Sequence, residues 1–153
     1  MSNLLEIAAF TIESAMAAEK AGADRIELCD NPQDGGTTPS YGMLVMAKEC
    51  VSIPVFPIIR PRGGDFLYTE ISFEMMRKDV KLCRELGFEG VVIGMLTKDG
   101  NIDEMNVSKL IALAYPMEVT FHRAFDRVRD PFDSLEKLIS IGVPFDPFDV
   151  LLP

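Results

Sequence analysis

The sequence has little of what metal, redox and membrane proteins depend on. Its three cysteines, Cys29, Cys50 and Cys83, form no CxxC pair and no even set, which favours a reducing compartment. His122 is the only histidine, so the chain cannot supply a His-rich zinc site. No GxGxxG follows the first apolar segment, and this argues against a dinucleotide-binding domain.

Long apolar runs and an excess of basic charge are also missing. No apolar run approaches the roughly 18 residues that a membrane span needs. The N-terminus has no basic start followed by an apolar segment, so we expect no signal peptide. The 15 Lys and Arg are outnumbered by 24 Asp and Glu, which gives a net charge of -9. This balance argues against binding to nucleic acid or to an anionic membrane surface.

The sequence is that of one globular domain in which short apolar segments alternate with helical stretches. Its 153 residues are 48% hydrophobic and 25% charged, which is enough to build a core. Apolar segments predict strands at 4–8, 25–29, 55–60, 90–95 and 117–121. Helical patterns and capping residues predict helices at 12–21, 41–50, 72–86, 104–114 and 131–141.

Five repeats of strand and helix predict an α/β fold with a parallel sheet and helical crossovers. The strands begin about 28 residues apart, which is the rhythm of an eight-unit (β/α) TIM barrel of about 250 residues. An open doubly wound sheet also fits the alternation. After Gly142 a sixth strand is due, but Pro144 and Pro147 interrupt it. We therefore expect residues 1–142 to form about five of eight units, and 143–153 to be an aberrant proline-rich tail of a truncated chain.

Polar side chains gather at the predicted strands and just beyond their ends. In a parallel barrel, functional groups collect where the strands end. Alternate residues of one strand share a face, so three side chains of the second strand point the same way. The candidate residues, in chain order, are Glu6, Arg25, Glu27, Cys29, Arg60, Arg62, Asp65, His122, Arg123 and Asp126.

Each of the charged candidates has a structural and a functional interpretation. A buried carboxylate is costly unless it is paired, so Glu27 either forms an ion pair with Arg25 or Arg60 or belongs to a substrate or metal site. The loop from Arg60 to Asp65 holds two arginines and two glycines. Such a loop suits a carboxylate or phosphate ligand, and it is equally suited to an internal salt bridge with Asp65. The loop 34–39 is either a ligand lid or a plain turn.

The histidine and one of the cysteines also leave more than one interpretation open. His122 is a general acid or base, or one ligand of a mixed metal site, or a core histidine with satisfied hydrogen bonds. Cys29 ends a strand, where a thiolate can bind a soft metal such as Cu(I); otherwise it is a small buried apolar residue. Cys83 lies on the apolar face of a predicted helix and belongs to the core.

Three segments resemble one protein family. They are residues 21–42, 53–69 and 119–131, which contain the motifs RIELC, IRPRGGDF and TFHRAFD. They closely resemble the CutC copper homeostasis family, and the resemblance extends from about residue 4 to Gly142. It implies a TIM barrel, a cytoplasmic location, homo-oligomers, a link to copper tolerance and Cu(I) binding.

The resemblance also implies site residues. The polar mouth of the family's barrel falls on Glu6, Arg25, Glu27, Arg60, Arg62, Asp65, His122, Arg123 and Asp126. Copper binding in the family is attributed to cysteines, one of which falls on Cys29. Ala8 stands where the first strand of family members often carries another, which weakens a two-thiolate copper site. Family members also continue past the position of Gly142.

Three functional hypotheses follow. The first is a copper homeostasis protein that binds Cu(I) or handles intracellular copper. The second is a barrel enzyme acting on a small anionic metabolite with a phosphate or carboxylate group. In it Arg60 and Arg62 hold the anion, His122 transfers a proton, and Asp126 or Glu27 orients or replaces it. The third is a truncated family member, marginally stable or associating through the open edges of its first and fifth strands.

Overall fold

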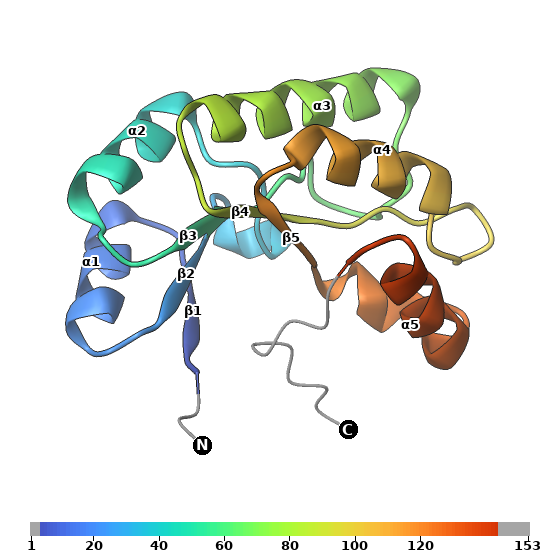
Figure 1. The fold of residues 1–153 in the computed structure, drawn as a ribbon, viewed down its shortest axis with the longest axis horizontal. Helices are drawn as coiled ribbons and strands as arrows, with labels where there is room; N and C mark the ends of the chain where they lie inside the picture. The colour runs from blue at the N-terminus through green and yellow to red at the C-terminus, as the bar shows by residue number, and fades with distance from the viewer. Residues whose placement is uncertain (1–3, 144–153) are drawn as a thin grey trace.

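The computed structural model describes residues 4–143, in which five parallel strands are each followed by a helix (Figure 1). The strands are β1 (Glu6–Ala9), β2 (Arg25–Leu28), β3 (Val55–Pro57), β4 (Gly90–Ile93) and β5 (Glu118–Phe121). The helices are α1 (Ile12–Lys20), α2 (Tyr41–Cys50), α3 (Glu70–Glu85), α4 (Glu104–Ala114) and α5 (Pro131–Ser140), with short 3₁₀ helices η1 (Pro32–Asp34) and η2 (Arg123–Arg127). Residues 144–153, with the predicted tail, lie outside this description.

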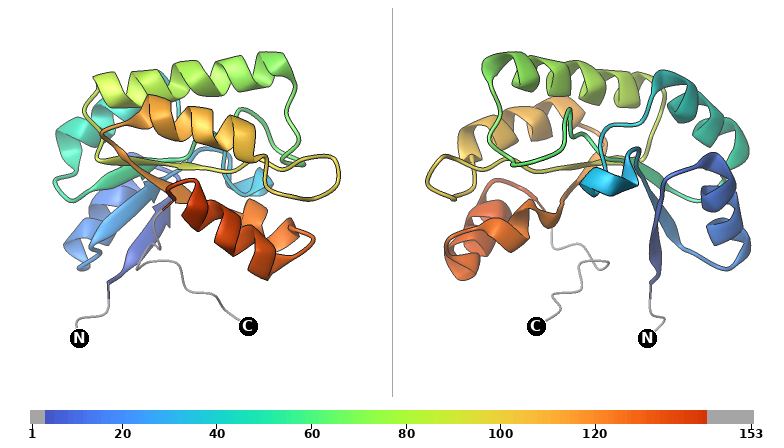
Figure 2. Two further views of the ribbon diagram at one scale, coloured as in Figure 1. Left: turned by 45° about the vertical axis from the view of Figure 1, so that its right-hand side comes forward. Right: turned by 180° about the vertical axis from the view of Figure 1, so that it is seen from behind.

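The strands form one curved parallel layer in chain order. β1, β2 and β3 pair with one another, and β4 pairs with β5. A parallel bridge between Ile58 and Val92 joins the two groups. The helices follow one another in an arc outside the strands, and the arc is open between α1 and α5 (Figures 1 and 2). The predicted α/β fold of the parallel barrel type is confirmed, and the sheet does not close within the described residues.

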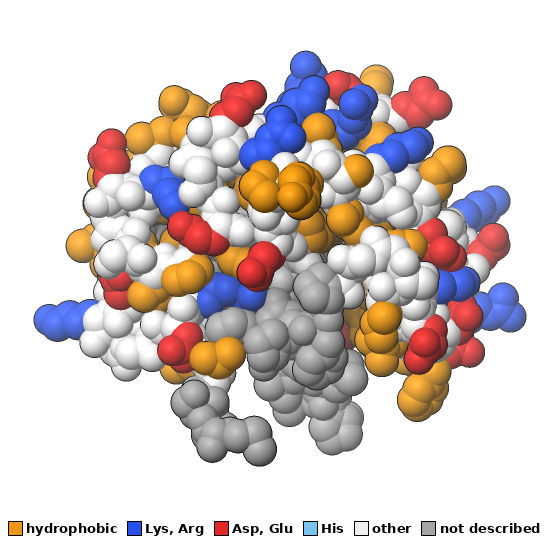
Figure 3. Space-filling view, in the orientation of Figure 1, with side chains coloured by type: hydrophobic (Ala, Val, Ile, Leu, Met, Phe, Trp, Pro, Cys, Tyr) orange, Lys and Arg blue, Asp and Glu red, His pale blue; other side chains and the backbone are white. Residues whose placement is uncertain are grey.

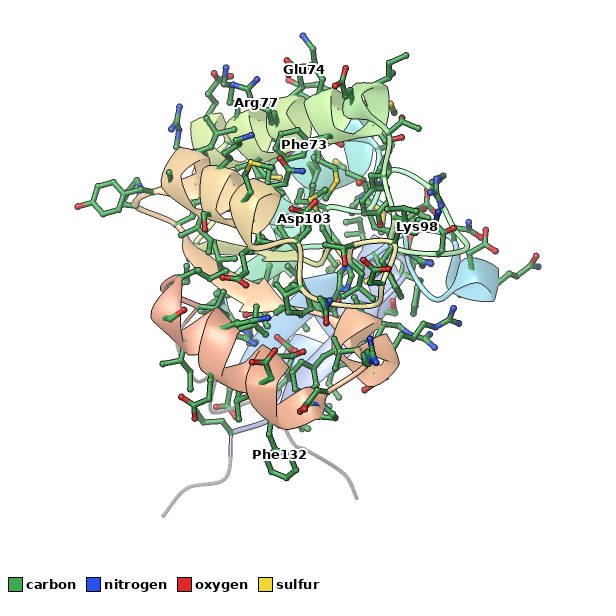
Figure 4. The ribbon with its side chains drawn as sticks, turned by 90° about the vertical axis from the view of Figure 1, so that its right-hand side faces the viewer. Phe73, Glu74, Arg77, Lys98, Asp103 and Phe132 are labelled. Carbon is green, nitrogen blue, oxygen red and sulfur yellow. The ribbon has the colours of Figure 1, made fainter. Side chains whose placement is uncertain are left out.

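Local sequence signals place the helix ends. Thr11, Ser40, Thr69, Asp103 and Asp130 accept hydrogen bonds from the first turns of α1 to α5 in order, as N-cap residues do. Figure 4 shows Asp103 where the chain enters α4. The cap at position 69 makes α3 begin two residues before the apolar pattern predicts, because Glu70 and Ile71 are exposed and do not belong to its buried face.

The two faces of the strands have different partners. Side chains such as Ile26, Ile93 and Phe121 pack with the helices in the main hydrophobic core. On the opposite face, Cys29, Phe56, Ile58 and Val92 form a second, smaller apolar cluster. Because side chains alternate along a strand, the predicted site residues that lie in the strands, Glu6, Arg25 and Glu27, are on this second face. The polar site is therefore placed on the inner, concave side of the curved sheet.

The outer surface is ordinary for a water-exposed protein. Acidic and basic side chains are interspersed on the face that Figure 3 shows. Phe132 at the beginning of α5 is 84% exposed and points away from the body of the molecule (Figure 4). No helix within residues 4–143 is both long and apolar enough to cross a membrane.

Two glycines allow a direct test of the packing. A Cβ on Gly90 of β4 would lie 2.3 Å from the ring of Phe56, whereas a Cβ on Gly42 of α2 would meet nothing within 4 Å. We expect Gly90→Ala to lower the free energy of unfolding by about 1–3 kcal/mol through overpacking. Gly42→Ala is the matched control and is expected to raise it by about 0.5–1 kcal/mol, because alanine favours the helix. Urea denaturation measures both changes, and equal effects would contradict the packing described.

Candidate functional site at the carboxyl ends of the strands

Arg60, just beyond β3, ties two loops to the end of the sheet. Its side chain is buried, with 3% of the residue exposed. Nη1 donates hydrogen bonds to the carbonyl oxygens of Asp34 (2.6 Å) and Gly36 (2.8 Å), and Nη2 donates to that of Gly64 (2.9 Å). The backbone N–H of Arg60 donates to Thr38 Oγ1. One cation therefore fixes both glycine-containing loops that the sequence singles out.

These loops and η2 enclose a pocket of about 330 Å³, here called the strand-end pocket. Its lining is Pro32, Gln33, Asp34, Gly35, Arg60, Gly64, Phe66, Arg123 and Arg127. Three of these side chains are cationic and one is anionic, although the chain as a whole has a net charge of -9. Excess positive charge in a concave site of an acidic protein favours an anionic ligand.

The phenyl ring of Phe66 holds the polar groups of the pocket together. The guanidinium carbon of Arg60 lies 4.9 Å from the ring centroid, and that of Arg127 lies 5.8 Å from it. The His122 ring centroid is 5.1 Å away. Cations attract the negative faces of aromatic rings, so Phe66 positions both arginines without consuming their hydrogen-bond donors.

His122, just beyond β5, is buried as a neutral imidazole, with 7% of the residue exposed. Burial, and then the positive charge of Arg60, lower its pKa to about 3. Its Nδ1 accepts a hydrogen bond from the backbone N–H of Ala124 (3.1 Å), so the proton of the neutral ring is on Nε2. The ring lies directly over Gly94, where a Cβ would be 2.2 Å from it.

Arg62 and Asp65 are paired within their own loop. Arg62 Nη2 donates to Asp65 Oδ1 at 2.7 Å and to the Leu67 carbonyl oxygen at 2.6 Å, and the hydrogen bond lowers the pKa of Asp65. The structure thus contains the internal salt bridge that the sequence offered as an alternative to an anion site. Neither residue lines the strand-end pocket, and neither does Asp126, which is exposed on η2.

A second polar group lies at the other end of the inner face. Glu6 and Arg25 occupy opposite positions in the register of β1 and β2 and form an ion pair. The Arg25 guanidinium also lies 4.2 Å from the Phe56 ring centroid. Glu27, two residues further along β2, is half-buried on the same face. The charges of Glu6 and Arg25 therefore compensate each other where β1 and β2 begin, away from the pocket.

The cysteines do not gather around a metal position. Burial, and then the negative charge of Glu27, raise the pKa of Cys29 and keep it a thiol. Cys83 belongs to the core under α3, where burial raises its pKa to about 12, and Cys50 ends α2. Within residues 4–143, no group of three or more His, Cys, Asp or Glu side chains is arranged to hold a metal ion. These residues fit a copper ion poorly.

Comparison with known proteins identifies the family. The model of the CutC family matches residues 3–145. The chain belongs to the CutC family. A CutC family protein of Chromobacterium violaceum is 54% identical over 142 residues, covering 93% of this chain and 58% of the relative. One from Salmonella typhimurium is 53% identical over 140 residues, covering 92% and 56%. The chain thus spans little more than half the length of the curated relatives it matches.

Solved structures agree with this assignment. The crystal structure of CutC from Streptococcus agalactiae, described as a candidate copper homeostasis protein, is 34% identical with a TM-score of 0.87. The match covers 92% of this chain and 70% of that one. A Burkholderia cenocepacia protein described as a candidate lyase or mutase has a TM-score of 0.61 at 14% identity, covering 92% of this chain and 56% of that one, and shares the fold alone.

Sequence reasoning missed three residues of the site. Arg127 lines the pocket, Phe66 is in contact with both of its buried polar groups, and Gly94 makes room for the histidine ring. The motif IRPRGGDF contains Phe66, and a glycine directly after the buried strand 90–93 was the available signal for Gly94. No pattern pointed to Arg127, because a 3₁₀ turn has no strong periodicity.

The buried imidazole predicts a specific pH dependence of stability. Its pKa is about 3 in the folded chain and about 6.5 when unfolded, so only the unfolded state is protonated between these values. The free energy of unfolding therefore falls as the pH is lowered through this window, by roughly 1.4 kcal/mol per unit well inside it. We expect His122 to make the free energy of unfolding roughly 2 kcal/mol lower at pH 5 than at pH 7.

The control for this prediction is His122→Asn. Asparagine accepts the Ala124 hydrogen bond through Oδ1 but does not titrate. The variant therefore keeps the pH dependence of the unfolding free energy that the carboxylates cause, and it loses the part that His122 causes. Urea denaturation at both pH values gives the comparison. The same loss in wild type and variant would contradict a buried neutral histidine.

Proposed function

We propose that the strand-end pocket binds a small anionic metabolite through a phosphate or carboxylate group. The observation that carries the proposal is the Arg60 guanidinium, which is buried at the pocket yet has an Nε–H without a hydrogen-bond partner among the described residues. A buried unsatisfied donor is costly, and a charged one more so. A bound anion removes that cost.

The rest of the lining supports the same ligand class. Arg123 and Arg127 add two guanidinium groups, whose planar forks match carboxylate and phosphate oxygens. Gly35 and Gly64 both have left-handed backbone conformations, with φ of 76° and 86°. Without a side chain, Gly64 leaves its backbone N–H accessible to an anion, whereas the N–H of Gly35 donates to the Pro32 carbonyl oxygen. Arg123 Nη1 is close enough to Gly35 that a Cβ there would lie 2.5 Å from it.

An enzyme of the TIM-barrel type is the natural setting for such a pocket. In this proposal the arginines hold the anion, and His122 packs against Phe66, which lines the pocket. Asp126 and Glu27 lie outside the pocket lining, so neither carboxylate touches the bound anion. A cytoplasmic location and assembly into homo-oligomers are also part of the proposal; three free cysteines support the first, and the family resemblance supports the second.

Phosphate binding by the full chain tests the pocket. We expect inorganic phosphate, titrated calorimetrically at low ionic strength, to bind wild type and to bind Arg123→Gln about tenfold to a hundredfold more weakly, the effect of one charge-assisted hydrogen bond. Arg123 is exposed, so this variant should fold.

Arg62→Gln is the matched control, because Arg62 is engaged with Asp65 and lies outside the pocket lining. Its phosphate affinity should equal that of wild type. If phosphate affinity fell equally in the two variants, phosphate binding would depend only on the net charge of the protein. That result would contradict anion binding in the strand-end pocket.

Copper handling is the second candidate function. The Streptococcus agalactiae neighbour is described as a copper homeostasis protein, and Cys29 is the one thiol on the inner face of the sheet. Cu(I) bound there would have to displace a proton from a thiol whose pKa is raised by burial. Copper is therefore expected to bind this chain weakly.

A competition assay separates the two candidates. With a Cu(I) chelator present at pH 7, we expect wild type and Cys29→Ala to retain the same small amount of copper, because a thiol kept protonated is a poor ligand. Cys83→Ala controls for nonspecific thiol binding. Tight retention by wild type that is lost only in Cys29→Ala would favour copper binding as the primary activity.

A further inference from the structure

Two buried polar atoms at or beside the strand-end pocket have no hydrogen-bond partner in the described part of the chain. They are Nε of Arg60, which lines the pocket, and Nε2 of His122, which packs against the pocket residue Phe66. In their present form both can donate a hydrogen bond and neither can accept one. Buried polar groups in proteins are nearly always satisfied, so a set made up of donors indicates missing acceptor atoms.

The hydrogen-bonding state of His122 is fixed by the backbone. Its Nδ1 accepts a hydrogen bond from the backbone N–H of Ala124. His122 is thus the N-cap residue of η2. An imidazole whose Nδ1 accepts and which is neutral has its proton on Nε2. Burial and the neighbouring Arg60 and Arg123 both disfavour a second proton. His122 is therefore a donor at Nε2, a role different from proton transfer, which is one of the three interpretations that the sequence leaves open.

The aromatic ring of Phe66 connects this donor with the pocket. Phe66 lines the pocket, the Arg60 guanidinium lies over its ring, and the His122 ring is 5.1 Å from it between centroids. The histidine is held in that position from below by the bare backbone of Gly94. Phe66 therefore places the histidine beside the residues that line the pocket, although His122 is not itself part of the lining.

We propose that His122 is a specificity-determining residue, which donates from Nε2 to a second oxygen-bearing group of the ligand in the strand-end pocket. This proposal rests on the proposed anion-binding function and narrows its ligand class. The ligand carries two acceptor groups on a short carbon chain: an anionic group held by the arginines, and a carboxylate or carbonyl oxygen at the histidine. A neutral donor binds that oxygen and stabilises negative charge that develops on it.

The tautomer is measured first, on the full chain without ligand. His122 is the only histidine, so long-range ¹H–¹⁵N correlation spectra contain one imidazole and need no assignment by mutation. The proposal expects a neutral ring protonated at Nε2, unchanged between pH 5 and pH 8. A ring protonated at Nδ1, or one that titrates near pH 6.5, overturns the proposal.

The ligand class is measured with two probes that share one anionic group. Ethyl phosphate offers the phosphate alone, and 2-phosphoglycolate adds a carboxylate on a chain of similar length. We expect wild type to bind phosphoglycolate at least tenfold more tightly. His122→Asn keeps the acceptor for the Ala124 N–H and loses the donor at Nε2, so it should bind the two probes alike. His122→Gln, which restores a donor near that position, should recover part of the preference.

The outcomes separate this proposal from the one on which it rests. If ethyl phosphate does not bind wild type, the anion pocket itself is refuted, and the proposal falls with it. If ethyl phosphate binds but phosphoglycolate gains nothing, or if His122→Asn keeps the gain, only the role of His122 is refuted. Retained affinity of His122→Asn for ethyl phosphate shows that the variant is folded and that its pocket is intact.

Discussion

The candidate site depends on one buried guanidinium. Arg60 donates to carbonyl oxygens from residues 34, 36 and 64, and so holds two glycine-containing loops against the end of β3. Burying a charge is favourable only when hydrogen bonds replace the lost water. Three carbonyl oxygens accept hydrogen bonds from Nη1 and Nη2 of Arg60. In the proposed function, a ligand in the pocket accepts the hydrogen bond of the remaining Nε–H. The same interaction thus shapes the loops and leaves a donor for a ligand.

The strands make this arrangement possible because their two faces carry different chemistry. The outer face is apolar and packs on the helices, which supplies the stabilising burial. The inner face carries the ion pair of Glu6 with Arg25 at one end, a small apolar cluster in the middle, and Arg60 with His122 at the other. Polar groups are concentrated where parallel strands end, which is where proteins with barrels of this type place their sites.

Much of the fold could be predicted from the sequence, and less of the site. The helix at 41–50 was predicted with its observed bounds, Tyr41–Cys50, because a helical pattern is a local signal. The pairing of Arg62 with Asp65 was open at the sequence level, since spacing alone does not separate a loop salt bridge from an anion site. Binding of Arg60 to distant carbonyls and the orientation of His122 could not be predicted, because both depend on how loops far apart in sequence meet.

The central claim is that the buried Arg60 Nε–H belongs to an anion-binding pocket. Arginine Nε–H resonances of the full chain, followed during titration with inorganic phosphate, test it most directly. A buried Nε–H exchanges slowly with water and gives a signal that Arg60→Lys removes. The account predicts that this signal shifts with phosphate and saturates together with the amide of Gly64. An Arg60 signal unchanged at saturating phosphate, with shifts confined to other arginines, would contradict it.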